Sequence, residues 1–213
     1  MRLRYGENFA RSTQAIAYGE EIRFGDVRIK FYPAGHVLGS AQIAVTCKDT
    51  CIVASGDYKD APDPTCAPLE VVPCDVFITE ATFGLPVFRH GDAAEEVKKL
   101  LASARLFPER AHLIGAYALG KAQRVIALLR EAGYDAPVYL HGAMESITQY
   151  YQSRGVRLGE LRAVLGMKKS DLAGTITLAP PSATSDLWTR RFPDPVTAFA
   201  SGWMRVRARA RQR

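Results

Sequence analysis

Three polar side chains that could do metal or acid–base chemistry each follow a strand-like run of residues. His36 lies in PAGHVLGS, Asp57 lies in SGDYK and Glu80 lies in ITEATFG. Side chains at strand ends, directed into a crevice, are where α/β folds place their sites. Imidazole and carboxylate groups are also ligands of zinc. Each residue alone fits a plain turn, but the order of all three, each after its own strand, favours a functional site.

A second stretch, Tyr117-Ala-Leu-Gly-Lys-Ala-Gln-Arg124, joins a predicted strand to a predicted helix. The first turn of a helix presents free N–H groups and the positive end of the helix dipole, which favour anions. Gly120 would let a phosphate approach, and Lys121 adds positive charge. The stretch is not a Walker P-loop, because the full GxxxxGK[ST] pattern is missing. The alternative is an ordinary helix start with solvated Lys121 and Arg124.

The elements that must position these residues are β-strands in the first third of the chain. Apolar-rich runs flank turn residues there, which indicates hairpins. Asp75–Thr79 is a short continuous apolar run, typical of a strand buried on both faces. The strands are expected at Ile22–Phe24, Val27–Tyr32, Ala41–Cys47, Cys51–Ala54 and Asp75–Thr79.

After Gly84 the pattern changes to alternating helices and strands, which predicts a mainly parallel sheet covered by helices. Asp92 is placed as the N-cap of the first of these helices. Helices are expected at Ala93–Phe107, Leu119–Ala132 and Met144–Arg154, and strands at His112–Ala116, Pro137–Leu140, Thr175–Ala179 and Thr197–Ser201.

Composition places the chain among globular proteins. It has 213 residues, 47% of them hydrophobic, and a formal net charge of +6. No apolar stretch approaches the roughly 20 residues that span a bilayer, and no secretory signal opens the sequence. We therefore expect a cytoplasmic protein without a membrane partner. Blocks of like charge often serve as nucleic-acid tails, and the last nine residues carry Arg205, Arg207, Arg209, Arg211 and Arg213.

The four cysteines allow a zinc-site interpretation, but no CxxC pattern occurs. Cys47 and Cys51 flank a predicted turn, so reduced, structural cysteines are the favoured interpretation for all four, which also include Cys66 and Cys74.

The spaced motifs PAGHVLGSAQI, SGDYK, CDVFITEATFG, YALGKAQR and FASGWM resemble the metallo-β-lactamase/β-CASP nucleases over essentially the whole chain. They are most similar to the bacterial exonucleases associated with ATP-dependent DNA ligase. The resemblance implies that His36 belongs to the third zinc-ligand motif, and that Asp57 is the aspartate bridging two zinc ions. It implies that Glu80 is the acidic residue that opens the β-CASP region and supports the catalytic histidine.

The same resemblance implies nucleic-acid contacts along the family's cleft, at Tyr117, Gly120, Lys121, Gln123, Arg124, Ser201 and Gly202. It also implies the fold and domains: α/β, with a partial metallo-β-lactamase domain at residues 1–84. An inserted β-CASP domain with a mainly parallel sheet is expected at 85–204, and a basic segment at 205–213.

The signature motif His-x-His-x-Asp-His does not occur among the four histidines, which are His36, His90, His112 and His141. The two later family histidines are absent as well. We therefore expect a truncated form without activity of its own, since one His and one Asp cannot hold a two-zinc site. Incomplete strands should also leave Val53, Ile78 and their neighbours without part of their apolar cover.

The leading functional hypothesis is a zinc-dependent exonuclease acting on DNA ends in repair, with an ATP-dependent DNA ligase as a further partner. RNA processing is the alternative within the family, because nothing in these residues distinguishes a 2′-OH. A metal-free nucleic-acid-binding module is the hypothesis from another class, using Lys121, Arg124 and the arginine segment.

Overall fold

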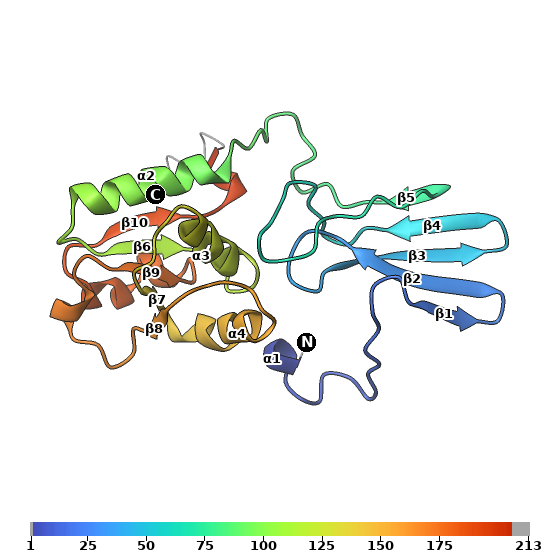
Figure 1. The fold of residues 1–213 in the computed structure, drawn as a ribbon, viewed down its shortest axis with the longest axis horizontal. Helices are drawn as coiled ribbons and strands as arrows, with labels where there is room; N and C mark the ends of the chain where they lie inside the picture. The colour runs from blue at the N-terminus through green and yellow to red at the C-terminus, as the bar shows by residue number, and fades with distance from the viewer. Residues whose placement is uncertain (1, 206–213) are drawn as a thin grey trace. The chain divides into compact units, whose positions relative to one another are not determined.

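A computed structural model describes residues 2–205 of the protein (Figure 1). The backbone divides after Thr82 into two units, each with a sheet of its own. The assignment of residues 1–84 and 85–204 to two family domains stays a prediction. Of the basic segment 205–213, all residues after Arg205 lie outside the described part, so the role of Arg207, Arg209, Arg211 and Arg213 stays a prediction too.

The first unit is built on a five-stranded sheet with the order β1-β2-β3-β4-β5. Neighbours from β1 to β4 are antiparallel, whereas β5 is parallel to β4. It follows that β2, β4 and β5 run in the same direction and end at one edge. The elements are α1 (Arg2–Tyr5), β1 (Glu21–Phe24), β2 (Val27–Pro33), β3 (Ala41–Cys47), β4 (Thr50–Ala54) and β5 (Val76–Ile78).

Strand β5 corrects one expectation about burial. Its three side chains, predicted to be buried on both faces, are 47%, 49% and 59% exposed. The strand is the last of its sheet, so it has a neighbour on one side only, and a continuous apolar run does not distinguish an edge strand from a central one. Ile78 is exposed as expected, but Val53 is fully buried beside its partner Ala44, so that expectation was wrong.

The second unit has a five-stranded sheet with the order β10-β6-β9-β7-β8, and every neighbouring pair is parallel. Its elements are α2 (Ala93–Leu106), β6 (His112–Gly115), α3 (Lys121–Glu131), β7 (Val138–Leu140), α4 (Gly142–Ser153), β8 (Leu161–Ala163), η1 (Lys169–Leu172), β9 (Ile176–Ala179), η2 (Ala183–Ser185), η3 (Leu187–Arg191), β10 (Val196–Phe199) and η4 (Gly202–Arg205). The predicted α/β class with a mainly parallel sheet is confirmed.

The core of the second unit lies around its central strands. Every residue of β6 and β9 is buried, as parallel strands with covered faces require. Ile126 and Leu129 of α3 are fully buried as well. Asp92 caps α2 as predicted, because its side chain accepts a hydrogen bond from the N–H of Ala94 at 2.9 Å. No helix within residues 2–205 is long and apolar enough to cross a membrane.

Arg130 of α3 fastens two loops to the second sheet. Its guanidinium donates to four carbonyl oxygens at 2.6 to 2.9 Å, those of Tyr134, Ala136, Leu158 and Glu160. The oxygens belong to the segments that lead into β7 and β8. Strand β8 has only three residues and no apolar run, which is why the sequence did not reveal it. Arg130 therefore supplies order that the local sequence lacks.

Arg130→Met should destabilise the protein by about 2 kcal/mol or more, because it leaves four carbonyl oxygens without a charged donor. Urea unfolding followed by circular dichroism measures the change. Arg105→Met is the matched control, since Arg105 is exposed at the end of α2. Equal stability of the two variants would contradict a structural role for Arg130.

Candidate functional site

His36 and Asp57 lie at the same edge of the first sheet. His36 follows the end of β2 and Asp57 follows the end of β4, and these strands run in the same direction. The Nε2 atom of His36 is 3.9 Å from Oδ2 of Asp57, too far for a hydrogen bond. The two side chains are 44% and 76% exposed. The imidazole nitrogen and the carboxylate oxygen therefore lie near each other where a ligand can reach them.

A close backbone contact holds the two turns together. Gly35 has φ +71°, and a Cβ built on it would lie 2.3 Å from the carbonyl oxygen of Lys59. The N–H of Lys59 in turn donates to the carbonyl oxygen of Ala34 at 3.0 Å. Only glycine allows both this backbone angle and this approach. The contact keeps the segment that carries Asp57 against the turn that carries His36.

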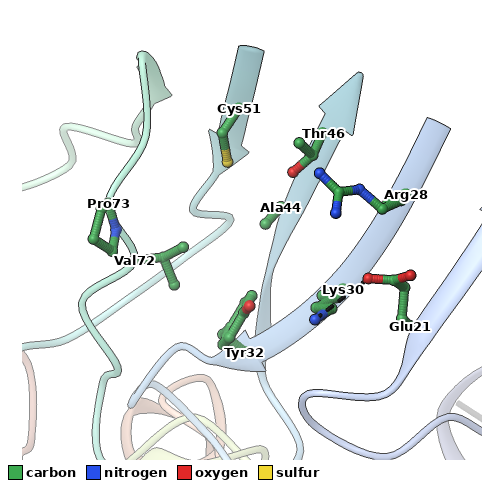
Figure 2. Close-up of a pocket in the computed structure, with 9 residues that line it drawn as sticks. All are labelled: Glu21, Arg28, Lys30, Tyr32, Ala44, Thr46, Cys51, Val72 and Pro73. Carbon is green, nitrogen blue, oxygen red and sulfur yellow. Dashed lines mark ion pairs between the residues drawn. The ribbon is translucent and has the colours of Figure 1, made fainter. Parts of the chain in front are cut away.

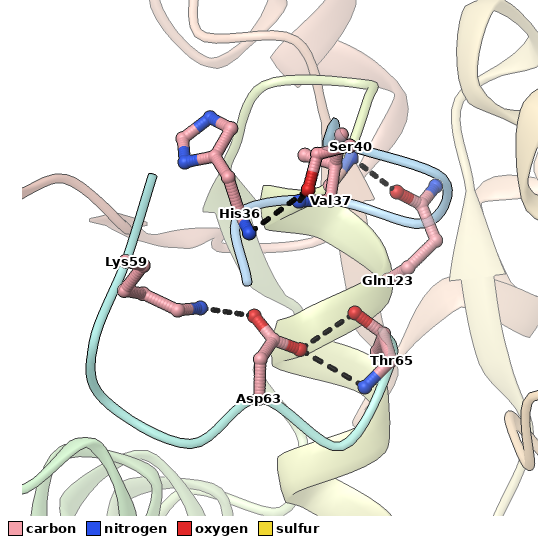
Figure 3. Close-up of polar contacts among 8 residues, drawn as sticks. His36, Val37, Ser40, Lys59, Asp63, Thr65 and Gln123 are labelled. Atoms are coloured by element: carbon pink, nitrogen blue, oxygen red, sulfur yellow. Dashed lines mark hydrogen bonds and ion pairs between the residues drawn. The ribbon is translucent and has the colours of Figure 1, made fainter. Parts of the chain in front are cut away.

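Ser40 shapes the turn around His36, as Figure 3 shows. Its Oγ accepts hydrogen bonds from the N–H groups of His36 at 3.1 Å and Val37 at 3.2 Å. The imidazole does not take part in these bonds, so the backbone is fixed while the ring stays available. Sequence reasoning missed Ser40. Serine is a common turn residue whose hydroxyl bonds nearby backbone groups, but the sequence does not show which groups it reaches.

Glu80 is joined to the turn of Asp57 through Ser55. The buried Ser55 Oγ accepts from the N–H of Glu80 at 3.4 Å and donates to the carbonyl oxygen of Gly56 at 2.7 Å. The Glu80 carboxylate accepts from the N–H of Thr82 at 2.6 Å, so it organises its own turn. The structure thus links the backbone of Glu80 to the turn that carries Asp57. Its predicted support of a catalytic histidine stays a prediction.

The donor set of this edge fits part of a metal site. Tetrahedral zinc binds nitrogen and oxygen at about 2 Å, so two of its ligands lie about 3.3 Å apart. His36 Nε2 and Asp57 Oδ2, at 3.9 Å, would have to approach each other slightly to bind one ion, and both side chains are exposed enough to move. Within residues 2–205, no group of three or more His, Cys, Asp or Glu side chains could hold a metal ion. The four cysteines are free thiols. The described residues therefore offer two ligands, and we derive no catalytic step through a metal.

A buried ion pair stabilises the loop that follows Asp57 (Figure 3). Lys59 Nζ contacts the Asp63 carboxylate, whose side chain is 3% exposed. Thr65 donates to the same carboxylate from its N–H at 2.9 Å and from its hydroxyl at 2.6 Å. Burial would raise the pKa of Asp63, but the hydrogen bonds from Lys59 and Thr65 outweigh it and lower the pKa from 3.8. The charged form is therefore favoured in the folded protein.

Asp63→Asn should destabilise the first unit by about 1–3 kcal/mol at pH 7, because Lys59 loses its buried partner. A lowered pKa contributes stability above the ordinary value of 3.8, and that contribution is lost as the pH falls through the folded value. The difference between wild type and variant should therefore shrink below about pH 4. Thermal melts from pH 7 to pH 3 measure it, with the exposed Asp60→Asn as the control. A pH-independent difference would contradict this account.

In the second unit, the predicted nucleic-acid residues gather at the carboxyl edge of β6 and β10. These strands are adjacent and parallel, and the N–H of Ala200 donates to the carbonyl oxygen of Gly115 at 2.8 Å. Tyr117 follows β6 and is 57% exposed, with its ring 6.5 Å from Phe199. Ser201 follows β10 at the same edge. The sheet thus brings together two motifs about 80 residues apart in sequence.

Gln123 acts inside the turn and not at its surface. The side chain is fully buried, and its Oε1 accepts from the N–H of Gly120 at 2.7 Å. Its Nε2 donates to the carbonyl oxygen of Ala118 and to the Thr148 hydroxyl. It therefore positions the start of α3, as the acceptor at the third position of a capping box does.

The start of α3 also corrects the expectation of free N–H groups for a phosphate. The N–H groups of Lys121 and Ala122 donate to the carbonyl oxygens of Leu119 and Tyr117, each at 3.0 Å. Gly120 donates to Gln123, as described above. The turn satisfies these donors internally, because its tight backbone with φ +79° at Gly120 folds the carbonyls back on them. A phosphate contact here would rest on the side chains of Lys121 and Arg124.

Neighbouring rings and a helix cap complete this edge. His141 caps α4, since its Nδ1 accepts from the N–H of Ala143 at 3.1 Å, and its ring packs against Trp188 at 4.9 Å. Burial and then the charge of Arg191 lower the pKa of His141, which suits a neutral acceptor. Gly202 lies so close to His90 that a Cβ would approach its ring to 2.8 Å. His141 therefore has a structural role as a helix cap, and His90 lies against the backbone at Gly202.

Comparisons with known proteins show that this chain is similar to proteins whose names refer to nucleic-acid enzymes. It is 26% identical over 200 residues to a probable DNA ligase from Opitutus terrae, a match that covers 91% of this chain and 19% of that protein. It is 28% identical to the RNase aCSPSF2 from Saccharolobus solfataricus, over 63% of this chain and 28% of the relative. A protein from the lig 3′ region of Acidianus ambivalens is 32% identical, and the match covers 62% of this chain and 93% of that protein.

No family model matches the sequence. A crystal structure of a protein of unknown function from Enterococcus faecalis aligns with 92% of this chain and 57% of its own, with a TM-score of 0.52 and 14% identity. That likeness concerns the fold alone. The chain spans about a fifth of the DNA ligase and about a quarter of the RNase.

Proposed function

Since the chain belongs to the metallo-β-lactamase/β-CASP family, we propose that it is part of a zinc-dependent nuclease that hydrolyses phosphodiester bonds. The observation that carries the proposal is the approach of His36 Nε2 to Asp57 Oδ2, 3.9 Å apart at one edge of the sheet. An imidazole and a carboxylate supported by a fixed backbone are what a zinc ion needs from two of its ligands.

His36 and Asp57 would hold zinc, and the metal would supply the activated water and offset the charge of the phosphate. The chain's own contribution is positional. Ser40 and Gly35 fix the turns from which the two ligands project, and Ser55 connects them to Glu80. A rigid backbone below exposed donors lets the ligands keep their geometry when a substrate approaches.

The proposed substrate is DNA, cleaved from its ends in repair, with an ATP-dependent DNA ligase as a functional partner. The relative from Opitutus terrae, called a probable DNA ligase, supports this, because the match covers nearly all of this chain. RNA processing is the second candidate, and the name of the RNase from Saccharolobus solfataricus favours it. For either substrate, we propose a cytoplasmic location.

The nucleic-acid surface is proposed at the carboxyl edge of the second sheet. Tyr117 offers an exposed ring on which a base can stack. Lys121 and Arg124 stand one turn apart on α3 and would contact neighbouring phosphates, and Ser201 and Gly202 belong to the adjacent strand end. Such contacts position a strand without reading its sequence.

Metal titration tests the first part of the proposal. Zn²⁺ or Mn²⁺ should bind the 213-residue chain weakly, and His36→Ala or Asp57→Ala should lower the affinity at least about tenfold. Asp26→Ala, an exposed carboxylate in a hairpin turn, should leave it unchanged. Equal affinity in all variants would refute the assignment of the ligands.

Cleavage assays on single- and double-stranded DNA and on RNA should leave the substrates intact with this chain alone, because its described residues supply two metal ligands. Metal-dependent cleavage that His36→Ala abolishes would contradict the expected inactivity. Tighter binding of one polymer than of the other, measured with matched DNA and RNA oligonucleotides, distinguishes the two substrate candidates. Binding of either polymer that is independent of both His36 and metal would favour the metal-free binding module.

Lys121→Ala should weaken nucleic-acid binding for all sequences alike and reduce the slope of log affinity against log salt by about one unit. Fluorescence anisotropy with a labelled oligonucleotide at several salt concentrations measures both quantities. Lys99→Ala is the control, because Lys99 is an exposed residue of α2 that pairs with Glu96. Unchanged affinity and slope in Lys121→Ala would mean that the lysine is an ordinary surface charge.

A further inference from the structure

The first sheet carries a pocket on its polar face, and neither His36 nor Asp57 lines it (Figure 2). The pocket has a volume of about 260 Å³, and strands β1 to β4 form its floor. Val72 and Pro73, in the segment before β5, form a wall. That volume lies just below the roughly 300–1,000 Å³ of drug-sized ligand sites, which suits one small molecule.

Strand register places several hydrogen-bond donors on this floor. Arg28, Lys30 and Tyr32 alternate along β2, so their side chains point to the same face. The direct partner of Arg28 on β3 is Thr46, whose hydroxyl also lines the pocket. A guanidinium, an ammonium and two hydroxyl groups therefore converge from two adjacent strands.

The charges of the pocket are not balanced. Glu21 is the carboxylate that lines it, and this residue already pairs with Lys30 at 3.4 Å and with Arg23 at 2.8 Å. Arg28 has no ion pair or hydrogen bond from its side chain to any of residues 2–205. Moreover, Arg23 and Arg28 are direct cross-strand partners, and like charges placed opposite each other destabilise a sheet. An anion beside Arg28 would relieve that repulsion.

The remaining walls suit a ring or a sugar. Tyr32 contributes an aromatic ring, and Ala44, Val72 and Pro73 contribute apolar surface. Aromatic faces accept nucleobases of any type. A guanidinium binds phosphate with two parallel hydrogen bonds, which gives both charge and orientation. Cations at one end and apolar walls at the other correspond to the two halves of a nucleotide.

We propose that this pocket binds a nucleoside monophosphate, either free or as the terminal nucleotide of a strand. The phosphate contacts Arg28, Lys30 and Thr46, and the sugar or base lies against Tyr32 and Val72. The inference goes beyond the proposed nuclease function, since it needs neither a metal ion nor cleavage. It adds a second nucleotide-binding position in the first unit, on the polar face of the sheet.

In the experiment, the 213-residue chain is titrated with dAMP in metal-free buffer. Isothermal titration calorimetry measures the affinity, and changes in the NMR chemical shifts of residues in β2 and β3 locate the binding. We expect saturable binding with Kd no weaker than about 1 mM. Arg28→Gln should weaken it at least about tenfold, since a hydrogen bond to a charged group is lost. The exposed Arg11→Gln, outside the pocket, is the control and should change it less than twofold. Arg28 is exposed, so the variant should keep its fold, which circular dichroism checks.

Two further ligands test whether the phosphate is needed, and whether the nucleotide is free or belongs to the end of a strand. Deoxyadenosine, which lacks the phosphate, should bind at least about tenfold more weakly than dAMP. A 5′-phosphorylated oligonucleotide that competes with dAMP supports the terminal nucleotide of a strand, and its failure to compete supports a free nucleotide. No saturable dAMP binding, equal losses in Arg28→Gln and Arg11→Gln, or equal binding of deoxyadenosine would each overturn the proposal. None of these results depends on metal binding by His36, so they remain distinct from a failure of the nuclease proposal.

Discussion

Strands that run in the same direction end at the same edge of their sheet, and both candidate sites depend on this constraint. In the first unit, β2, β4 and β5 are aligned, so His36, Asp57 and Glu80 leave the sheet at one side. In the second unit the whole sheet is parallel, and Tyr117 and Ser201 follow neighbouring strands. Strand direction thus makes neighbours of residues that are distant in the sequence.

Turns then convert this common edge into a defined geometry. Gly35 and Lys59 approach backbone to backbone, which only a residue without Cβ permits. The hydroxyl groups of Ser40 and Ser55 hydrogen-bond neighbouring backbone atoms. The buried ion pair of Lys59 and Asp63 stabilises the loop that follows. The backbone of the turns is thus hydrogen-bonded, while the side chains of His36 and Asp57, the two possible metal ligands, stay exposed. A site that must admit a ligand needs both properties.

Two arginines illustrate how the same side chain serves structure or binding. The guanidinium of Arg130 is satisfied by four carbonyl oxygens and ties loops to a sheet. That of Arg28 lies on an exposed sheet face opposite another arginine, with no partner among the described residues. Because a guanidinium has five donors and no acceptor, its role follows from the oxygen atoms around it. The composition of the chain does not distinguish the two cases.

The sequence by itself determined the succession of elements and the residues worth testing. Periodicity located nearly every strand and helix, Asp92 was recognisable as a cap, and the motifs around His36 and Asp57 identified the family. These features are local, so a linear reading finds them. The tertiary structure decided what depends on neighbours distant in the chain. It decided that β5 is an exposed edge strand and that Gln123 is buried. It also decided that the N–H groups of Gly120, Lys121 and Ala122, at the start of α3, are hydrogen-bonded within the turn. It also decided the polar pocket, because cross-strand register, which no local pattern encodes, sets Arg28 beside Thr46 and opposite Arg23.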